Sequence, residues 1–195
     1  MEQFKEYLQK RVAITDEQFA LISTKLKVKH FDKNEMLLMK GEVTTQVYFV
    51  LEGLLRSYSI DHKGKTHIIQ FAPEQWWMSD RNSVLFNEGS DFFIDAIEPT
   101  KAVVMPKGFM EEAVALVPCM GNLNTTMLHN SIRFMQKRIN MLLSATAEER
   151  YLNFIQLYPN LTLRVPQWMI ASYLGITPES LSRVRKDLTN KHFKA

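Results

Sequence analysis

Residues 166–188, PQWMIASYLGITPESLSRVRKDL, have the pattern of two short helices joined by a tight turn. Pro166 suits the first turn of a helix, and Gly175 can adopt the left-handed conformation that ends one. Thr177 can cap the second helix, and the small side chain of Ala171 allows the two helices to cross closely. Together these features predict a helix–turn–helix.

The second of these helices, residues 178–189, is predicted to be a recognition helix. Such a helix lies in the major groove of DNA, where Arg reads guanine and Glu can accept from cytosine. Short polar side chains and a helix N-terminus suit phosphate oxygens. Lys191 and Lys194 are further candidates for phosphate contacts. Trp168 could pack against the DNA backbone or complete the core of the small domain, and the core is the expected place. The candidate DNA-binding residues are Thr177, Glu179, Ser180, Arg183, Arg185 and Lys186.

The distribution of charge favours a polyanionic partner at this end of the chain. The 195 residues carry 24 Lys and Arg against 21 Asp and Glu, a net charge of +3. From Tyr151 onward the net charge is +4, whereas residues 1–150 carry −1. The positive excess therefore coincides with the predicted helix–turn–helix, where phosphate binding would use it.

Between residues 27 and 105 the hydrophobic pattern has a period of two, which is typical of strands. Seven or eight short runs rich in β-branched and aromatic residues alternate with turn sequences, of which Asp61–Gly64 is the clearest hairpin turn. This pattern predicts an antiparallel sandwich or barrel. Residues 1–25 are helical in pattern, with Thr15 or Asp16 as the cap of a second short helix.

A long helix is predicted after the strands, because no Gly or Pro occurs from Asn122 to Leu143. Two apolar series run along it about 100° apart, so its apolar face is wider than one coiled-coil seam. We predict that one series packs on the β domain and the other on a partner helix; burial of both within one chain is the alternative. The residues of both series are candidate dimerisation residues. The first series is Leu128, Ile132, Met135, Ile139 and Leu142, and the second is Met120, Met127, Phe134 and Met141.

As a whole, the chain resembles the Crp/Fnr family of bacterial transcription regulators. The most specific motifs are YFVLEG at residues 48–53 and ITPESLSR at residues 176–183. The resemblance covers essentially the whole chain and implies an effector-sensing roll, a homodimer formed through the long helix, and base reading by Glu179 and Arg183. The expected partners are double-stranded DNA, a second copy of the chain and RNA polymerase.

The resemblance also implies an α+β fold with three parts. These are an N-terminal double-stranded β-helix (jelly-roll) sensor domain at 1–118, a dimerisation helix at 119–145 and a C-terminal winged helix–turn–helix domain at 146–195. The family usually has a β-hairpin wing after the recognition helix, whereas only residues 190–195 follow it here. Whether they form a wing stays open, and residues 161–165 are predicted to form a strand that supplies what sheet there is. Where the family often has Arg before the Glu of the recognition helix, this chain has Pro178, so a different operator is expected.

The effector cannot be named from the sequence. Related cyclic-nucleotide sites use Gly-Glu-Leu and then Arg-Ser or Arg-Thr, with the Arg bound to the phosphate. Here Ser79–Asp80 and Ser90–Asp91 stand at those places, and an Asp would repel the ligand, so cyclic AMP or GMP is not expected. Trp76 and Trp77 could line an apolar pocket or belong to the core. The possible effector pocket comprises Trp76, Trp77, Ser79, Asp80, Arg81, Ser90 and Asp91.

Other classes of function find less support in the composition. The single Cys119 excludes a disulfide scaffold and a cysteine-bound iron–sulfur cluster, and the five His residues lack the spacing of metal ligands. No apolar run is long enough to span a membrane, and a cytoplasmic location is expected. We predict no catalytic residue, metal or cofactor. The alternatives are a ligand-binding regulatory subunit that acts through protein partners and a cupin-like enzyme.

Overall fold

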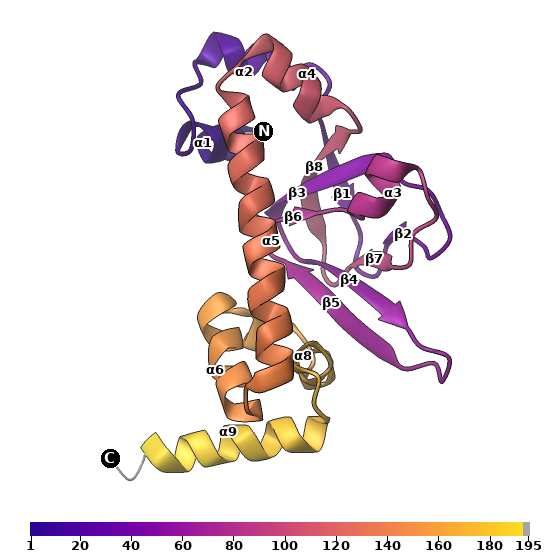
Figure 1. The fold of residues 1–195 in the computed structure, drawn as a ribbon, viewed down its shortest axis with the longest axis vertical. Coiled ribbons are helices and arrows are strands. Elements are labelled where there is room, and N and C mark those ends of the chain that lie inside the picture. Colours follow the sequence, from indigo (N-terminus) through magenta and orange to yellow (C-terminus); the bar gives the residue numbers. More distant parts are fainter. Residues whose placement is uncertain (193–195) are drawn as a thin grey trace. The chain divides into compact units, whose positions relative to one another are not determined.

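The computed structural model describes residues 1–192, and Lys194 lies outside the described residues. The described chain forms two compact units (Figure 1). Unit 1 comprises Met1–Ser59 with Ile69–His129, and unit 2 comprises Ile60–Ile68 with the chain from Asn130 onward. Strands confined to residues 27–106, followed by helices from residue 109 onward, confirm the predicted α+β fold.

The strands form two four-stranded antiparallel sheets, in the orders β1-β8-β3-β6 and β2-β7-β4-β5. Most strands pair with partners that are distant in the chain, such as β1 with β8 and β2 with β7. The eight strands in two sheets confirm the predicted sandwich of seven or eight strands. The strand bounds are β1 (Lys27–Phe31), β2 (Met36–Leu38), β3 (Gln46–Glu52), β4 (Leu55–Ile60), β5 (Thr66–Ala72), β6 (Trp77–Met78), β7 (Phe93–Ala96) and β8 (Thr100–Pro106).

The turn between β4 and β5 has the geometry that its sequence predicts. Asp61 Oδ1 accepts hydrogen bonds from the backbone N–H groups of Lys63 at 2.8 Å and Lys65 at 3.0 Å. Gly64 has a φ of +77°, which glycine adopts without the Cβ clash of other residues. The hairpin is therefore closed by local chemistry alone.

An aromatic cluster forms much of the core of unit 1. The ring of Phe49 on β3 lies 4.9 Å from that of Phe4 and 4.6 Å from that of Tyr7 between centroids. Trp77 packs on Phe49 at 5.2 Å and donates a 3.0 Å hydrogen bond from Nε1 to the hydroxyl of Tyr7. Trp77 is therefore a core residue, one of its two predicted roles. The helices of this part are α1 (Glu2–Gln9), α2 (Asp16–Ser23, capped by Thr15), α3 (Arg81–Phe86) and α4 (Phe109–Leu116).

From Met120 to His192 the regular secondary structure is entirely helical. Its helices are α5 (Met120–Ser144), α6 (Ala147–Leu157), α7 (Leu161–Arg164), α8 (Gln167–Leu174) and α9 (Pro178–His192). The core of unit 2 includes the rings of Phe154, Tyr158 and Tyr173, whose centroids lie 5.3 to 5.8 Å apart. Because α9 continues to His192, the described residues after the recognition helix contain no strand.

The predicted strand at residues 161–165 is wrong, because this segment forms the short helix α7. Leu161 and Val165, four residues apart, are both buried, while Leu163 between them is 90% exposed. Burial at a spacing of four is the signature of one helical face, whereas a strand would bury Leu163 with its neighbours at a spacing of two. The alternating sequence fits both patterns, and packing decides between them.

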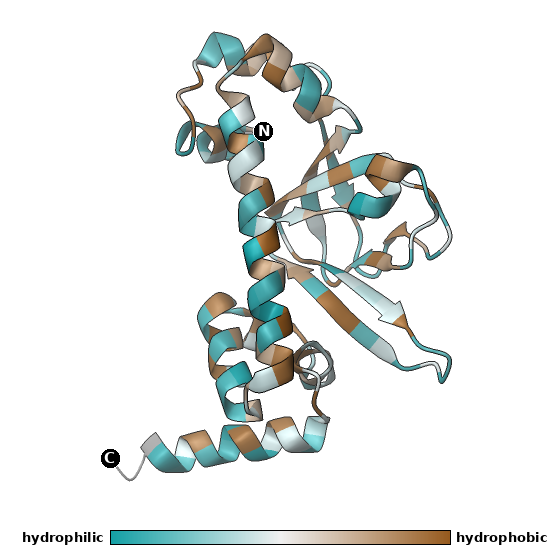
Figure 2. Ribbon diagram, viewed as in Figure 1, coloured by the Kyte–Doolittle hydropathy of each residue, from teal (hydrophilic) through white to brown (hydrophobic). Residues whose placement is uncertain are grey.

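The two apolar series of α5 differ in exposure, and the assignment of Met120 to the dimer interface is wrong because its side chain is fully buried within one chain. Met120 is buried in the core of unit 1, and Met127 packs against the same core. By contrast, Ile132, Met135 and Ile139 are 53%, 53% and 57% exposed. Figure 2 shows hydrophobic segments alternating with hydrophilic ones along α5. A single chain therefore covers one series and leaves most of the other open to solvent.

Candidate nucleic-acid interface and effector pocket

The turn between α8 and α9 has the close geometry of a helix–turn–helix. Gly175 ends α8 with a φ of +66°, and a Cβ there would lie 3.3 Å from Leu142 Cδ2. The backbone N–H of Ile176 donates to the carbonyl of Ala171 at 3.0 Å, which satisfies the end of the helix. Ala171 is 1% exposed, as expected where two helices meet. The helix–turn–helix that the sequence predicts is present.

The start of α9 is held by Thr177. Its Oγ1 accepts a 3.2 Å hydrogen bond from the backbone N–H of Ser180, so Thr177 is the predicted N-cap and Pro178 is the first helical residue. A hydrogen bond from its own backbone N–H and a second from the Thr177 hydroxyl hold the pKa of Glu179 below its usual range. Glu179 is therefore kept as an anion at the positive end of the helix dipole.

The candidate DNA-binding residues occupy two sides of α9. Glu179, Arg183 and Lys186 follow at steps of four and three, so they lie within an arc of about 60° on the helix, and all three are exposed. Arg185 is half-buried and lies on another side, and Ser180 is half-buried beside the cap.

The exposed face of α9 contains two residues that the sequence reasoning did not select. Ser182 and Asn190 are exposed and lie on the same side as Glu179 and Arg183. Ser182 and Asn190 follow Glu179 by three and eleven residues. These are spacings of one helical face, so the sequence contains the signal that identifies both residues. We call Glu179, Ser182, Arg183, Lys186 and Asn190 the reading face.

The surroundings of Trp168 and Lys191 in unit 2 differ from those that the sequence predicts. Trp168 is 43% exposed, so its predicted place in the core is wrong. The inner side of α8 is filled by other residues, including Ile170 and Leu174, and Trp168 in the first turn faces outward. Lys191 forms an ion pair with Glu148 on α6, at 2.8 Å, so its ammonium group has a partner within unit 2.

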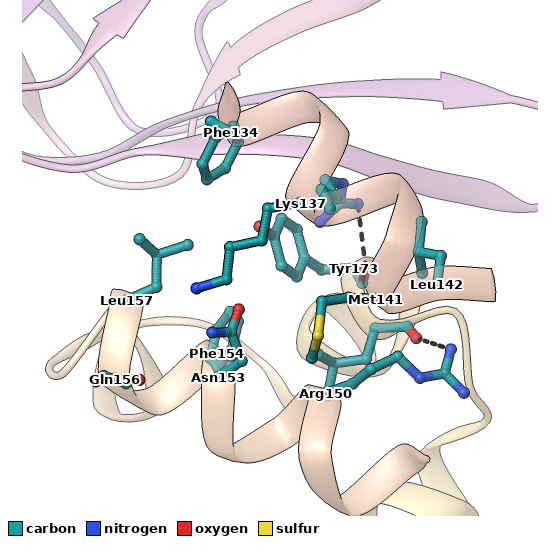
Figure 3. Close-up of a pocket in the computed structure, with 12 residues that line it drawn as sticks. Phe134, Lys137, Met141, Leu142, Arg150, Asn153, Phe154, Gln156, Leu157 and Tyr173 are labelled. Carbon is teal, nitrogen blue, oxygen red and sulfur yellow. Dashed lines mark hydrogen bonds between the residues drawn. The ribbon is translucent and has the colours of Figure 1, made fainter. Parts of the chain in front are cut away.

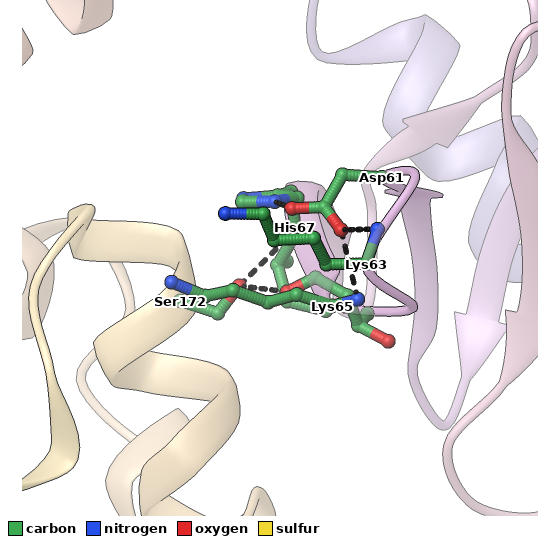
Figure 4. Close-up of polar contacts among 7 residues, drawn as sticks. Asp61, Lys63, Lys65, His67 and Ser172 are labelled. Carbon is green, nitrogen blue, oxygen red and sulfur yellow. Dashed lines mark hydrogen bonds and ion pairs between the residues drawn. The ribbon is translucent and has the colours of Figure 1, made fainter.

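The tip of the β4–β5 hairpin belongs to the same unit as the helix–turn–helix. Ser172 Oγ on α8 accepts a hydrogen bond from the backbone N–H of Ile68 at 3.0 Å and donates one to the carbonyl of Thr66 at 2.9 Å (Figure 4). Arg138 Nη2 on α5 donates to the carbonyls of Ile68 and Tyr173, both at 3.1 Å. Because β5 is the edge strand of its sheet, the bonds to Thr66 and Ile68 satisfy backbone groups that no neighbouring strand reaches.

The residues of the possible effector pocket differ in burial and in hydrogen bonding. Asp80 is 4% exposed and caps α3, with Oδ1 accepting from the backbone N–H of Asn82 at 3.0 Å. Among the described residues, its Oδ2 is buried without a hydrogen-bond partner. Ser90 is buried and bonds to the backbone of Phe92. Arg81 and Asp91 are exposed, while Trp76 and Ser79 are half-buried.

The fold and the reading face define a class of protein: a β-sandwich domain followed by a long helix and a helix–turn–helix. Residues 28–115 match the family model described as the cyclic nucleotide-binding domain. Within the described residues, no helix is long and apolar enough to cross a membrane.

Known regulatory proteins are similar to this chain in sequence. The chain is 26% identical over 168 residues to an anaerobic regulatory protein of Aggregatibacter actinomycetemcomitans, and 24% identical over 168 residues to the regulatory protein HlyX of Actinobacillus pleuropneumoniae. Each alignment covers 80% of this chain, and 64% and 69% of those proteins respectively. The chain thus spans about two thirds of the length of these relatives.

Solved structures share the fold at lower identity. The structure of FixK2 from Bradyrhizobium japonicum is 20% identical, with a TM-score of 0.74 and 86% of each chain covered. The catabolite activator protein of Thermus thermophilus is 15% identical, with a TM-score of 0.56, and 92% of this chain and 85% of that chain are covered. The matched domain, the regulatory relatives and the fold agree with the resemblance of the chain to the Crp/Fnr family.

Proposed function

We propose that this protein is a sequence-specific, dimeric DNA-binding transcription regulator that acts in the cytoplasm. The observation that carries the proposal is the reading face of α9, which presents an anion and two cations in one exposed arc. A recognition helix requires such polar residues at its N-terminal half, because those residues reach the base edges of the major groove. The regulatory relatives support the same reading over an enzyme.

Base recognition would come from Glu179 and Arg183. An Arg side chain can form two hydrogen bonds to guanine O6 and N7, and a Glu carboxylate can accept from the amino group of cytosine. Thr177 and Ser180 at the helix start, together with Lys186, suit phosphate oxygens. Arg185, on another side of the helix, would act on the backbone rather than on bases.

Dimerisation would use the exposed series of α5. Ile132, Met135 and Ile139 follow at alternating steps of three and four, which is the spacing of a coiled-coil seam. A second copy of the chain would remove these side chains from water and would place two reading faces on one duplex. Two-fold symmetry then predicts a roughly palindromic operator, with half-sites about one helical turn apart.

We further propose that the β-roll does not bind a cyclic nucleotide in the manner of cyclic-nucleotide-binding rolls. Asp91 and Ser90 stand where those rolls have the phosphate-binding Arg and its neighbour, and Asp91 is exposed rather than paired. The buried, unpartnered Oδ2 of Asp80 would instead accept a hydrogen bond from a donor on the effector. Contact with RNA polymerase is a further part of the proposal.

The decisive experiment is selection of a binding site from random duplexes, followed by fluorescence anisotropy across a salt series. We expect a palindromic consensus that binds at least about 10³-fold more tightly than random DNA, and a steep decline of affinity with salt. Equal affinity for selected and random duplexes would contradict the proposal. In that case, tight calorimetric binding of a cyclic nucleotide without DNA affinity would favour a regulatory subunit.

A further inference from the structure

Unit 2 contains a cavity of about 230 Å³ between α5, α6 and the end of α8 (Figure 3). Its apolar walls include Phe134 and Met141 from α5 and Phe154 and Leu157 from α6. The volume is smaller than the roughly 300–1,000 Å³ of pockets for drug-sized ligands, so its occupant is a small molecule.

The polar lining of this cavity is one-sided in charge. Lys137, Arg138 and Arg150 contribute three cations, and none of the residues that line the cavity is acidic. The nearest acids in sequence are used elsewhere: Glu148 pairs with Lys191, and Glu149 accepts from the backbone N–H of Thr146 in a capping box. The cavity therefore combines an apolar interior with uncompensated positive charge.

Two of the cations are already oriented, and each retains donors. Arg150 Nη1 donates to the carbonyl of Leu174 at 2.7 Å, while its Nε is buried without a partner among the described residues. Arg138 lies over the ring of Tyr173, with Cζ 3.6 Å from the centroid. A buried donor without an acceptor costs free energy, which a bound anion would recover.

The third cation, Lys137, has no partner within residues 1–192. Figure 3 shows its side chain extended across the cavity toward α6. Five residues separate it from Ile132, an angle of about 140° on an α-helix, so Lys137 lies away from the exposed series of α5. A second copy that packs on that series would leave Lys137 accessible.

We propose that this cavity binds a small organic monocarboxylate with a compact apolar body. The carboxylate is held by Lys137 and Arg150, and the apolar body lies against Met141 and Phe154. A carboxylate fits because it accepts charge-assisted hydrogen bonds from ammonium and guanidinium groups at once. This inference does not depend on DNA binding, and the β-roll plays no part in it.

The proposal is tested by calorimetric titration of the full chain with two probe acids, 3-phenylpropionate and octanoate, and with the uncharged 3-phenylpropanamide. We expect saturable binding of at least one acid, with one molecule per chain, and at least about tenfold weaker binding of the amide. Affinity should fall as salt is raised, since the cations are partly exposed. No saturable binding of either acid, or equal binding of 3-phenylpropionate and its amide, would overturn the proposal.

Variants of the residues that line the cavity test whether the acid binds there. Lys137→Glu should weaken binding of the better acid at least about tenfold, whereas Arg133→Glu, an equal change of charge on an exposed position of α5 outside the lining, should leave it unchanged. Met141→Trp fills the cavity and should abolish binding while circular dichroism still shows the folded chain. Wild-type affinity in either Lys137→Glu or Met141→Trp would overturn the proposal. If one of these variants does not fold, the other decides.

Discussion

The hydroxyl of Ser172 in the helix–turn–helix donates a 2.9 Å hydrogen bond to the backbone carbonyl of Thr66 at the hairpin tip. The same hydroxyl accepts a hydrogen bond from the backbone N–H of Ile68. One side chain therefore provides hydrogen-bond partners for two backbone groups of an edge strand. In this way unit 2 includes a piece of chain that is distant in sequence from the helices that contact DNA in the proposed function.

The first prediction concerns that contact. Ser172→Ala leaves the N–H of Ile68 without its acceptor, at a cost of about 1 kcal/mol, or about fivefold in local opening. Hydrogen exchange should therefore become faster at Ile68. Ser182→Ala, on the exposed side of α9, is the matched control and should leave this amide protected. Unchanged exchange in Ser172→Ala would show that the bond does not hold the hairpin tip.

The second prediction separates base reading from phosphate binding on α9. Arg183→Ala should cost about 1–3 kcal/mol at one base-pair position and relax the preference there. Lys186→Ala should instead weaken binding to all sequences about equally and lower the salt slope by about one. Site selection and anisotropy measure both effects, with Arg133→Ala as a control for loss of positive charge. A uniform loss from Arg183→Ala would contradict its assignment to bases.

The third prediction concerns the exposed series of α5. Ile139→Glu places a charge in the proposed seam between two copies, where burial without a partner is costly, so the variant should sediment as a monomer. Because Ile139 is 57% exposed in a single chain, the variant should keep its fold. Asn140→Glu adds the same charge on the neighbouring face and should remain dimeric. An Ile139→Glu dimer would place the interface elsewhere.

The fourth prediction concerns acid stability at the hairpin tip. Hydrogen bonds from His67 and from the backbone N–H groups of Lys65 and Lys63 hold the pKa of Asp61 below its usual 3.8. A carboxyl whose folded pKa is lowered adds stability above its ordinary pKa, and this stability is lost as the pH falls through the lowered value. NMR titration should therefore show Asp61 titrating below 3.8. Urea unfolding should show that Asp61→Asn loses less stability than wild type below about pH 4; an Asp61 pKa at or above 3.8 would contradict this.

The helix–turn–helix was predictable because each of its signals acts locally. Gly175 has the positive φ that ends α8, Thr177 caps α9, and Leu181 is fully buried as its helical spacing predicts. The same holds for the β4–β5 turn, where Asp61 and Gly64 close the hairpin through contacts within four residues. Such signals need no knowledge of the rest of the chain.

Other features escaped prediction because they depend on what lies opposite in space. Apolar residues alternate in segment 161–165 in a way that fits a strand. In the structure Leu161 and Val165 are buried but Leu163 between them is exposed, which is the pattern of a helix. Trp168 was expected in the core, but the interior is already filled by the other face of α8. In each case the sequence allows two packings, and the competition for interior space selects one.

By itself, then, the sequence determined the order of β-roll, long helix and helix–turn–helix, because period and turn chemistry act over a few residues. Tertiary structure decided which polar groups meet. It joined Ser172 to Thr66 and gathered Lys137 and Arg150 around an apolar cavity. These groupings follow from the packing of elements far apart in the chain, which local propensity does not encode.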